Sequence, residues 1–174
     1  MLTEIGRDSA RFIKMVQLML KVSPRRITLK DIERAIMLSE GSVKDKLIEI
    51  YIKKTLLALK SDDPVKPIIR NYRAYNHVVD ILEKFNLSQR MRDELKELAY
   101  YLMIKAIEYY KMVKNCKESV LAIQFALRVA YLSQSSDIIM KSLHNAGVMM
   151  ILCGMKAIGK EYIERAKKYK KELK

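Results

Sequence analysis

The sequence predicts an all-α protein, because it contains few turn residues and its apolar residues recur with a helical period. Only five glycines and three prolines interrupt the 174 residues, whereas turn-rich β structure uses both residue types far more often. Between them, apolar residues recur at spacings of three and four, as in amphipathic helices. Half of the chain is hydrophobic, so it can bury a core and is not disordered by composition.

Three helices are expected in the first third of the chain. Apolar positions at helical spacing predict the first over residues 3–22, and the Ser-Pro-Arg-Arg run that follows ends it. A second helix is expected over 28–37, a turn over 38–41 and a third helix over 42–59.

The segment 61–67 holds two of the three prolines and is the clearest break in the chain. We therefore predict domains at 1–61 and 68–174, with one combined domain as the alternative. Beyond the break, with Ser88 as the N-cap of the second, five more helices are expected, over 68–85, 89–114, 118–133, 136–153 and 156–173. The total is about eight helices.

The two cysteines, Cys116 and Cys153, have no further Cys or His near them at metal-ligand spacing, so no metal site is expected. We expect buried free thiols, with a disulfide as the alternative in a hyperthermophile. No apolar run reaches the roughly 18 residues of a membrane-spanning helix, and the charged N-terminus lacks a signal-peptide core. The expectation is a cytoplasmic protein with no membrane partner.

The formal net charge of +14 is the strongest global signal. An excess of this size favours a polyanionic partner, and nucleic acid is the commonest such partner. A solvated, lysine-rich helical surface is the alternative. The sequence contains no Gly-rich phosphate loop and no recognisable catalytic motif. We therefore expect neither a cofactor nor an enzyme.

The stretch 27–47 resembles the helix-turn-helix motif of transcription regulators. Ile32 and Ile36 correspond to core positions of its first helix, and Val43 and Leu47 to those of its second. The resemblance implies that Leu38 plugs the turn and that the hydroxyl of Ser39 caps the second helix. Met37 departs from it, because the motif usually has Gly there.

This resemblance implies a nucleic-acid-binding surface. The second helix would approach bases with its exposed start, and basic residues around it would contact phosphates. The residues concerned are Arg25, Arg26, Lys30, Ser42, Lys44 and Lys46.

Residues 140–173 resemble one tetratricopeptide repeat, a helical hairpin of about 34 residues. Gly147 stands at a first-helix packing position, Gly154 at the turn, and Gly159 and Ala166 at the small second-helix positions. The preceding hairpin, about 104–136, fits less well but repeats Ala122, Ala126 and Ala130 on one helical face. The resemblance implies a concave protein-binding face lined by Lys141, His144, Val148 and Ile151, with a scaffold or a homodimer contact as the alternative.

Arg70 and His77 resemble the arginine-to-histidine motif of the HEPN helical-bundle ribonucleases. Seven residues apart on one helix they would share a face, and the same helix would equally suit a non-catalytic RNA surface.

Taken together, these features predict a DNA-binding transcriptional regulator with a helical protein-interaction or dimerisation part. The alternatives are a helical subunit that binds RNA or single strands, a HEPN-like ribonuclease, and a non-catalytic scaffold.

Overall fold

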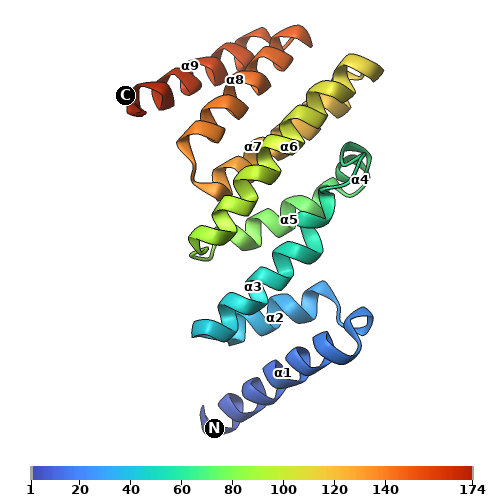
Figure 1. Ribbon diagram of the computed structural model, residues 1–174, viewed down its shortest axis with the longest axis vertical. Coiled ribbons are helices and arrows are strands. Elements are labelled where there is room, and N and C mark those ends of the chain that lie inside the picture. Colours follow the sequence, from blue (N-terminus) through green and yellow to red (C-terminus); the bar gives the residue numbers. More distant parts are fainter. Residues whose placement is uncertain (1, 174) are drawn as a thin grey trace. The chain divides into compact units, whose positions relative to one another are not determined.

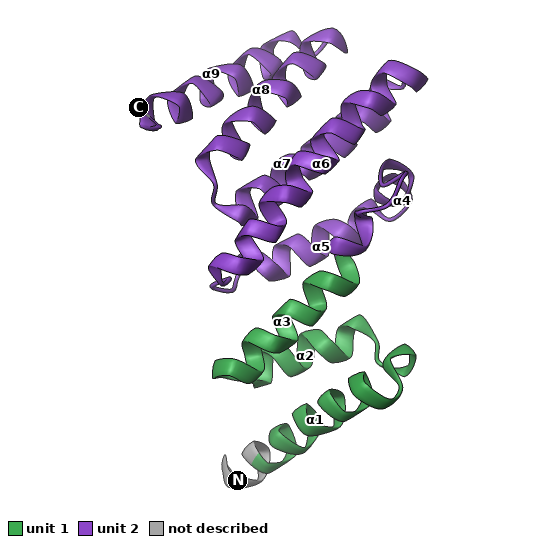
Figure 2. Ribbon diagram, in the orientation of Figure 1, with its two compact units in different colours: residues 1–55 green, residues 56–174 purple. Residues whose placement is uncertain are grey.

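The computed structural model describes the backbone of residues 2–173 and the side chains of residues 7–173. All regular structure in this part is helical, which confirms the all-α prediction (Figure 1). None of the helices described is long and apolar enough to cross a bilayer. The chain forms two compact units, Met1–Thr55 (unit 1) and Leu56–Lys174 (unit 2), shown in Figure 2. The segment 61–67, where the sequence suggests a domain boundary, lies within unit 2.

Unit 1 is built on a central helix that packs against both of the others. The buried stripe of this helix consists of Ile32, Ala35 and Ile36, none of which exposes any surface. In chain order the elements are α1 (Leu2–Val22), the 3₁₀ helix η1 (Pro24–Arg26), α2 (Leu29–Leu38) and α3 (Gly41–Thr55).

Unit 2 begins with a 3₁₀ turn and continues as a series of α-helices. The single helix expected over 42–59 is therefore wrong at its end, because the α-helix stops at Thr55 and a separate 3₁₀ turn follows. The elements are η2 (Leu57–Leu59), α4 (Val65–Arg70), α5 (Tyr72–Glu83), α6 (Gln89–Val113), α7 (Cys116–Ser133), α8 (Ser136–Leu152) and α9 (Lys156–Glu172).

The helix expected over 68–85 is divided in two at Asn71. The backbone of Asn71 leaves the helical region at φ −120° and ψ 34°, and its N–H donates to the carbonyl of Pro67 at 3.0 Å. Asparagine tolerates such a cap conformation better than most residues. Arg70 thus ends α4 while His77 lies within α5, so the two residues do not share the face of one helix.

The four long helices α6–α9 form two successive hairpins, α6 with α7 and α8 with α9 (Figure 1). Ser88 caps α6 as expected, since its hydroxyl accepts from the N–H of Met91 at 3.3 Å. The alanine face of α7, made of Ala122, Ala126 and Ala130, is buried between its neighbours. The second hairpin is anchored to the first because α7 also packs on α8.

Two glycines bring α8 and α9 into backbone contact. A Cβ added to Gly147 would lie 2.6 Å from the carbonyl oxygen of Gly159, and one added to Gly159 would lie 2.5 Å from that of Gly147. No larger residue fits this crossing without a shift of the backbone. Gly147 and Gly159 therefore constrain how α8 packs on α9, and Gly154 forms the turn between the two helices at φ +86°.

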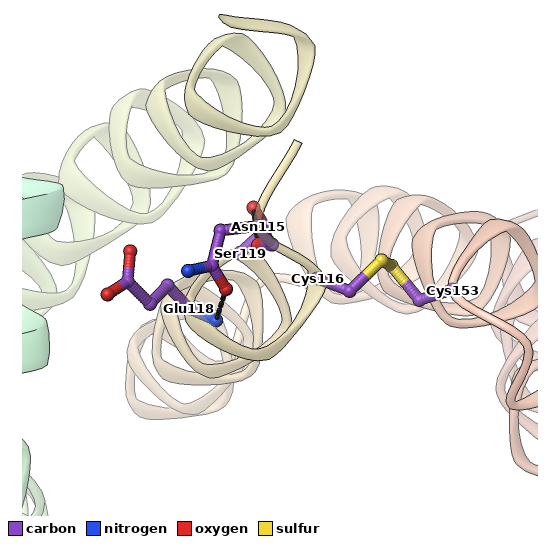
Figure 3. The surroundings of a disulfide bond; sticks show 5 residues. All are labelled: Asn115, Cys116, Glu118, Ser119 and Cys153. Carbon is purple, nitrogen blue, oxygen red and sulfur yellow. Dashed lines mark hydrogen bonds between the residues drawn. A yellow bond between two sulfur atoms is a disulfide. The ribbon is translucent and has the colours of Figure 1, made fainter. Parts of the chain in front are cut away.

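The two cysteines form a disulfide, so the expectation of free thiols is wrong (Figure 3). Cys116 is the first residue of α7 and Cys153 directly follows α8, with Cα atoms 5.6 Å apart. Because α7 and α8 are joined by a short turn and run in opposite directions, residues 37 positions apart meet at the open end of this pair. Asn115 caps α7 beside the disulfide by accepting from the N–H of Glu118 at 3.1 Å.

Candidate nucleic-acid interface

The start of α2 is fixed by a capping box. The hydroxyl of Thr28 accepts from the N–H of Asp31 at 3.2 Å, and the Asp31 carboxylate accepts from the Thr28 N–H at 3.0 Å. The Thr28 hydroxyl also donates to the Asp31 carboxylate at 2.7 Å, and this hydrogen bond, together with the one from the Thr28 N–H, holds the pKa of Asp31 below its ordinary value. Asp31 is therefore anionic at neutral pH, next to the exposed Lys30.

Two side-chain contacts attach α1 and α3 to α2. The guanidinium of Arg34 lies 4.7 Å from the centre of the Phe12 ring, which joins α2 to α1. The hydroxyl of Tyr51 on α3 donates to the Glu33 carboxylate on α2 at 2.6 Å. Burial and this hydrogen bond raise the pKa of Tyr51 well above its ordinary value, so the phenol remains protonated and keeps donating. The three helices thus form one connected framework.

A groove of about 460 Å³ lies between α1 and α3. Lys14 and Lys21 reach it from α1, and Lys46 reaches it from the second turn of α3. Lys14 and Lys21 are seven residues apart, so they lie on the same face of α1 and are separated by about 10 Å along its axis. Apolar side chains, among them Leu18 and Ile50, line the groove between the ammonium groups. The groove thus combines three lysines with apolar side chains.

The residues expected to contact nucleic acid occupy two separate places. Arg25 and Arg26 lie in η1 and Lys30 lies in the first turn of α2, and all three are exposed. Ser42 and Lys44 lie in the first turn of α3, which follows the other end of α2. Since α2 has ten residues, its length separates the two groups by about 15 Å. Of the predicted set, only Lys46 lines the groove.

The turn between α2 and α3 differs from the helix-turn-helix expectation in two ways. Leu38 does not plug the turn, because 39% of it is exposed. The hydroxyl of Ser39 donates back to the carbonyl of Ile36 at 3.1 Å and so completes α2 without capping α3. The residue that makes the turn is Gly41, whose φ of +59° favours glycine.

Sequence reasoning missed Lys14 and Lys21. The pattern over residues 3–22 predicts only an amphipathic helix, and the polar side of such a helix is ordinarily solvated. The available signal was their seven-residue spacing, which places two cations on one helical face. Their meeting with Lys46 depends on the packing of α1 and α3 around α2, which no local pattern specifies.

The face expected to bind protein is partly rearranged. Lys141, His144 and Val148 are exposed on α8. Ile151 instead packs under α9, because a Cβ on Gly159 would lie 2.7 Å from its side chain. It is therefore a packing residue of the α8–α9 crossing.

No group of three or more His, Cys, Asp or Glu side chains in the described part of the chain is arranged to hold a metal ion. Comparison with known proteins finds no matching family model, curated protein or solved structure.

Proposed function

We propose that the protein binds nucleic acid through unit 1, with duplex DNA as the ligand, and acts as a DNA-binding regulator. Unit 2 would then serve as its protein-interaction part. The observation that carries this proposal is a set of six exposed cations in unit 1. None of them forms an ion pair with any residue that the structure describes. The set consists of Lys14, Lys21, Arg25, Arg26, Lys30 and Lys46.

The lack of ion pairs matters because other lysines of the chain are paired. Lys53 pairs with Glu49 at 2.7 Å, and Lys66 pairs with Asp63 at 3.2 Å. A cation that is not held in an ion pair can neutralise a phosphate, and the counterions that the DNA then releases favour binding. The six cations fall into two groups, one at the groove and one at η1 and the start of α2. Two such groups can contact phosphates at two places along a backbone.

The scarcity of aromatic residues in unit 1 favours duplex DNA over single strands. Proteins that hold single strands generally stack bases on exposed aromatic rings. Residues 1–55 contain only two aromatic side chains, Phe12 and Tyr51. Tyr51 is fully buried and Phe12 lies under the guanidinium of Arg34. Unit 1 thus offers phosphate contacts without a stacking platform.

The test is a salt titration of binding to duplex DNA, single-stranded DNA and RNA of one length, measured by fluorescence anisotropy. The variant Lys14→Ala/Lys21→Ala/Lys46→Ala should bind duplex more weakly. Its slope of log K against log salt should be shallower by about 0.9 for each phosphate that the variant no longer neutralises. A second variant, Arg25→Ala/Arg26→Ala/Lys30→Ala, should show the same effect at the other group.

The matched control removes the same charge from unit 2 by the substitutions Lys84→Ala, Lys111→Ala and Lys117→Ala, all at exposed positions. The control should keep most of the affinity. If the control and the groove variant lose the same affinity for duplex DNA, the loss reflects net charge alone. This result would refute the groove as the binding site. Tighter binding to single strands or RNA than to duplex would overturn the choice of DNA.

A further inference from the structure

A second cleft, of about 380 Å³, lies between α8 and α9 in unit 2. It follows from the contact between Gly147 and Gly159, which holds the two backbones together at one point. Toward the start of α8 and the end of α9 the two ribbons separate (Figure 1). The cleft lies along this diverging part, next to Met140 and Lys170.

The cleft combines an apolar floor with a polar rim. Met140 on α8 and Ile163 and Ala166 on α9 form the floor. Polar groups surround them along both helices. They are Lys141, His144, Asn145, Lys167 and Lys170.

The charges at the rim are only partly neutralised. Lys141 pairs with Asp137 at 3.1 Å, and Lys167 pairs with Glu164 at 2.6 Å. The hydrogen bond from Lys167 lowers the pKa of Glu164, so this carboxylate stays ionised. Lys170 has no ion-pair partner among the described residues. The rim therefore retains an uncompensated cation beside an open apolar floor.

We propose that this cleft binds an acidic amphipathic segment of a partner protein. Apolar side chains of the segment would cover Met140 and Ile163, and its carboxylates would lie against Lys170 and Lys141. Helical hairpins of this kind bury their open faces by stacking further elements on them. A helix with apolar residues at spacings of three and four has the matching shape.

The carboxylates beside the cleft argue against nucleic acid as its occupant. A phosphate backbone would meet Asp137 and Glu164 next to the lysines, and the lining offers no Phe, Tyr or Trp ring for stacking. The apolar floor would also gain nothing from a phosphate backbone, whereas it gains from burying apolar side chains.

A second copy of the chain is also disfavoured by charge. Among the helices described, only α5 carries a net negative charge. Its Asp80 and Glu83 are already paired with Arg128, at 2.7 and 3.1 Å. None of the helices described therefore has unpaired acidic residues in net excess to offer to the cleft of another copy.

The test uses three synthetic 18-residue peptides and the full chain. The first peptide carries a leucine stripe at helical spacing flanked by glutamates, the second has lysines in place of the glutamates, and the third has serines in place of the leucines. Binding is followed by fluorescence anisotropy and by the NMR signals of the histidine rings. The chain has only two histidines, so the His144→Ala variant assigns both signals.

The acidic leucine peptide should bind and shift the His144 signal while leaving that of His77 unchanged. The variant Lys167→Glu/Lys170→Glu should bind it about tenfold more weakly or worse, because like charges then face each other. The control Lys156→Glu/Lys160→Glu makes the same charge change at exposed positions of α9 outside the cleft and should bind normally.

Three results would overturn the proposal. Equal binding of the serine peptide would show simple charge attraction, and equally weakened binding in the two lysine variants would place the peptide elsewhere. A His144 signal that moves with duplex DNA and not with the acidic peptide would assign the cleft to nucleic acid. The first two outcomes are independent of the DNA proposal, whose variants lie in unit 1.

Discussion

Removing the disulfide should destabilise unit 2 by about 4 kcal/mol. The double variant Cys116→Ala/Cys153→Ala opens a covalent loop whose ends are 37 residues apart. In the chain-entropy account, closing a loop of this length removes about 4 kcal/mol of conformational freedom from the unfolded chain at 25 °C. The native helices need not move, because α7 and α8 also pack along their lengths. The expected change is therefore in stability, with the helical content preserved.

The assay is equilibrium unfolding in urea, followed by far-UV circular dichroism with and without reductant. The native protein should become less stable on reduction and then match the alanine variant, whose own transition should not respond to reductant. Because the chain has only two cysteines, thiol titration of the unfolded, unreduced protein should detect no free thiol. Two titratable thiols, or a transition that ignores reductant, would refute the cross-link.

Four further changes test local features. Gly147→Ala should cost about 1–3 kcal/mol in urea unfolding, because the new Cβ overlaps the carbonyl oxygen of Gly159; unchanged stability would mean that the helices are further apart. Thr28→Ala should cost about 1 kcal/mol by removing the cap of α2. Since the folded pKa of Asp31 is lowered, its contribution is present above the unfolded pKa of about 3.9 and is lost as the pH falls through the folded value. When the free energy of unfolding of Asp31→Asn is measured against pH, this loss of stability in acid should be absent. Identical pH profiles for the variant and the native protein would contradict the prediction. Leu38→Ser should lower stability by no more than about 1 kcal/mol, because 39% of the residue is exposed and only its covered part loses apolar contact; a decrease above about 2 kcal/mol would show that Leu38 does plug the turn.

Much of the fold follows from local sequence. Apolar periodicity and cap residues place α6 within a residue at either end, because Ser88 offers the N-cap hydroxyl that this helix uses. The break at Asn71 carries no such signal, since neither Gly nor Pro stands there and the apolar period runs through it. The pairing of Cys116 with Cys153 is set by the direction of α7 against α8, which spacing alone does not encode.

The positive charge of the candidate interface could be predicted from the sequence, but which of its residues lie together could not. Arg25, Arg26 and Lys30 are exposed as their residue types suggest. Whether they lie beside Ser42 depends on the length and direction of α2, which separate them. The helix-turn-helix resemblance rests mainly on buried positions such as Ile32 and Leu47. Burial at those positions suits many pairs of packed helices, so it did not determine the turn.

At two turns of the chain, the handedness of a residue matters more than its size. Gly41 and Gly154 have φ of +59° and +86°, and a Cβ at either would meet no atom within 4 Å. An L-alanine there would be disfavoured by its own backbone alone. A D-alanine prefers positive φ and would meet no such penalty, and it would also narrow the conformations open to the unfolded chain. The mirror-image residue is thus the better fit at both turns, and among the standard residues glycine comes nearest to it without strain.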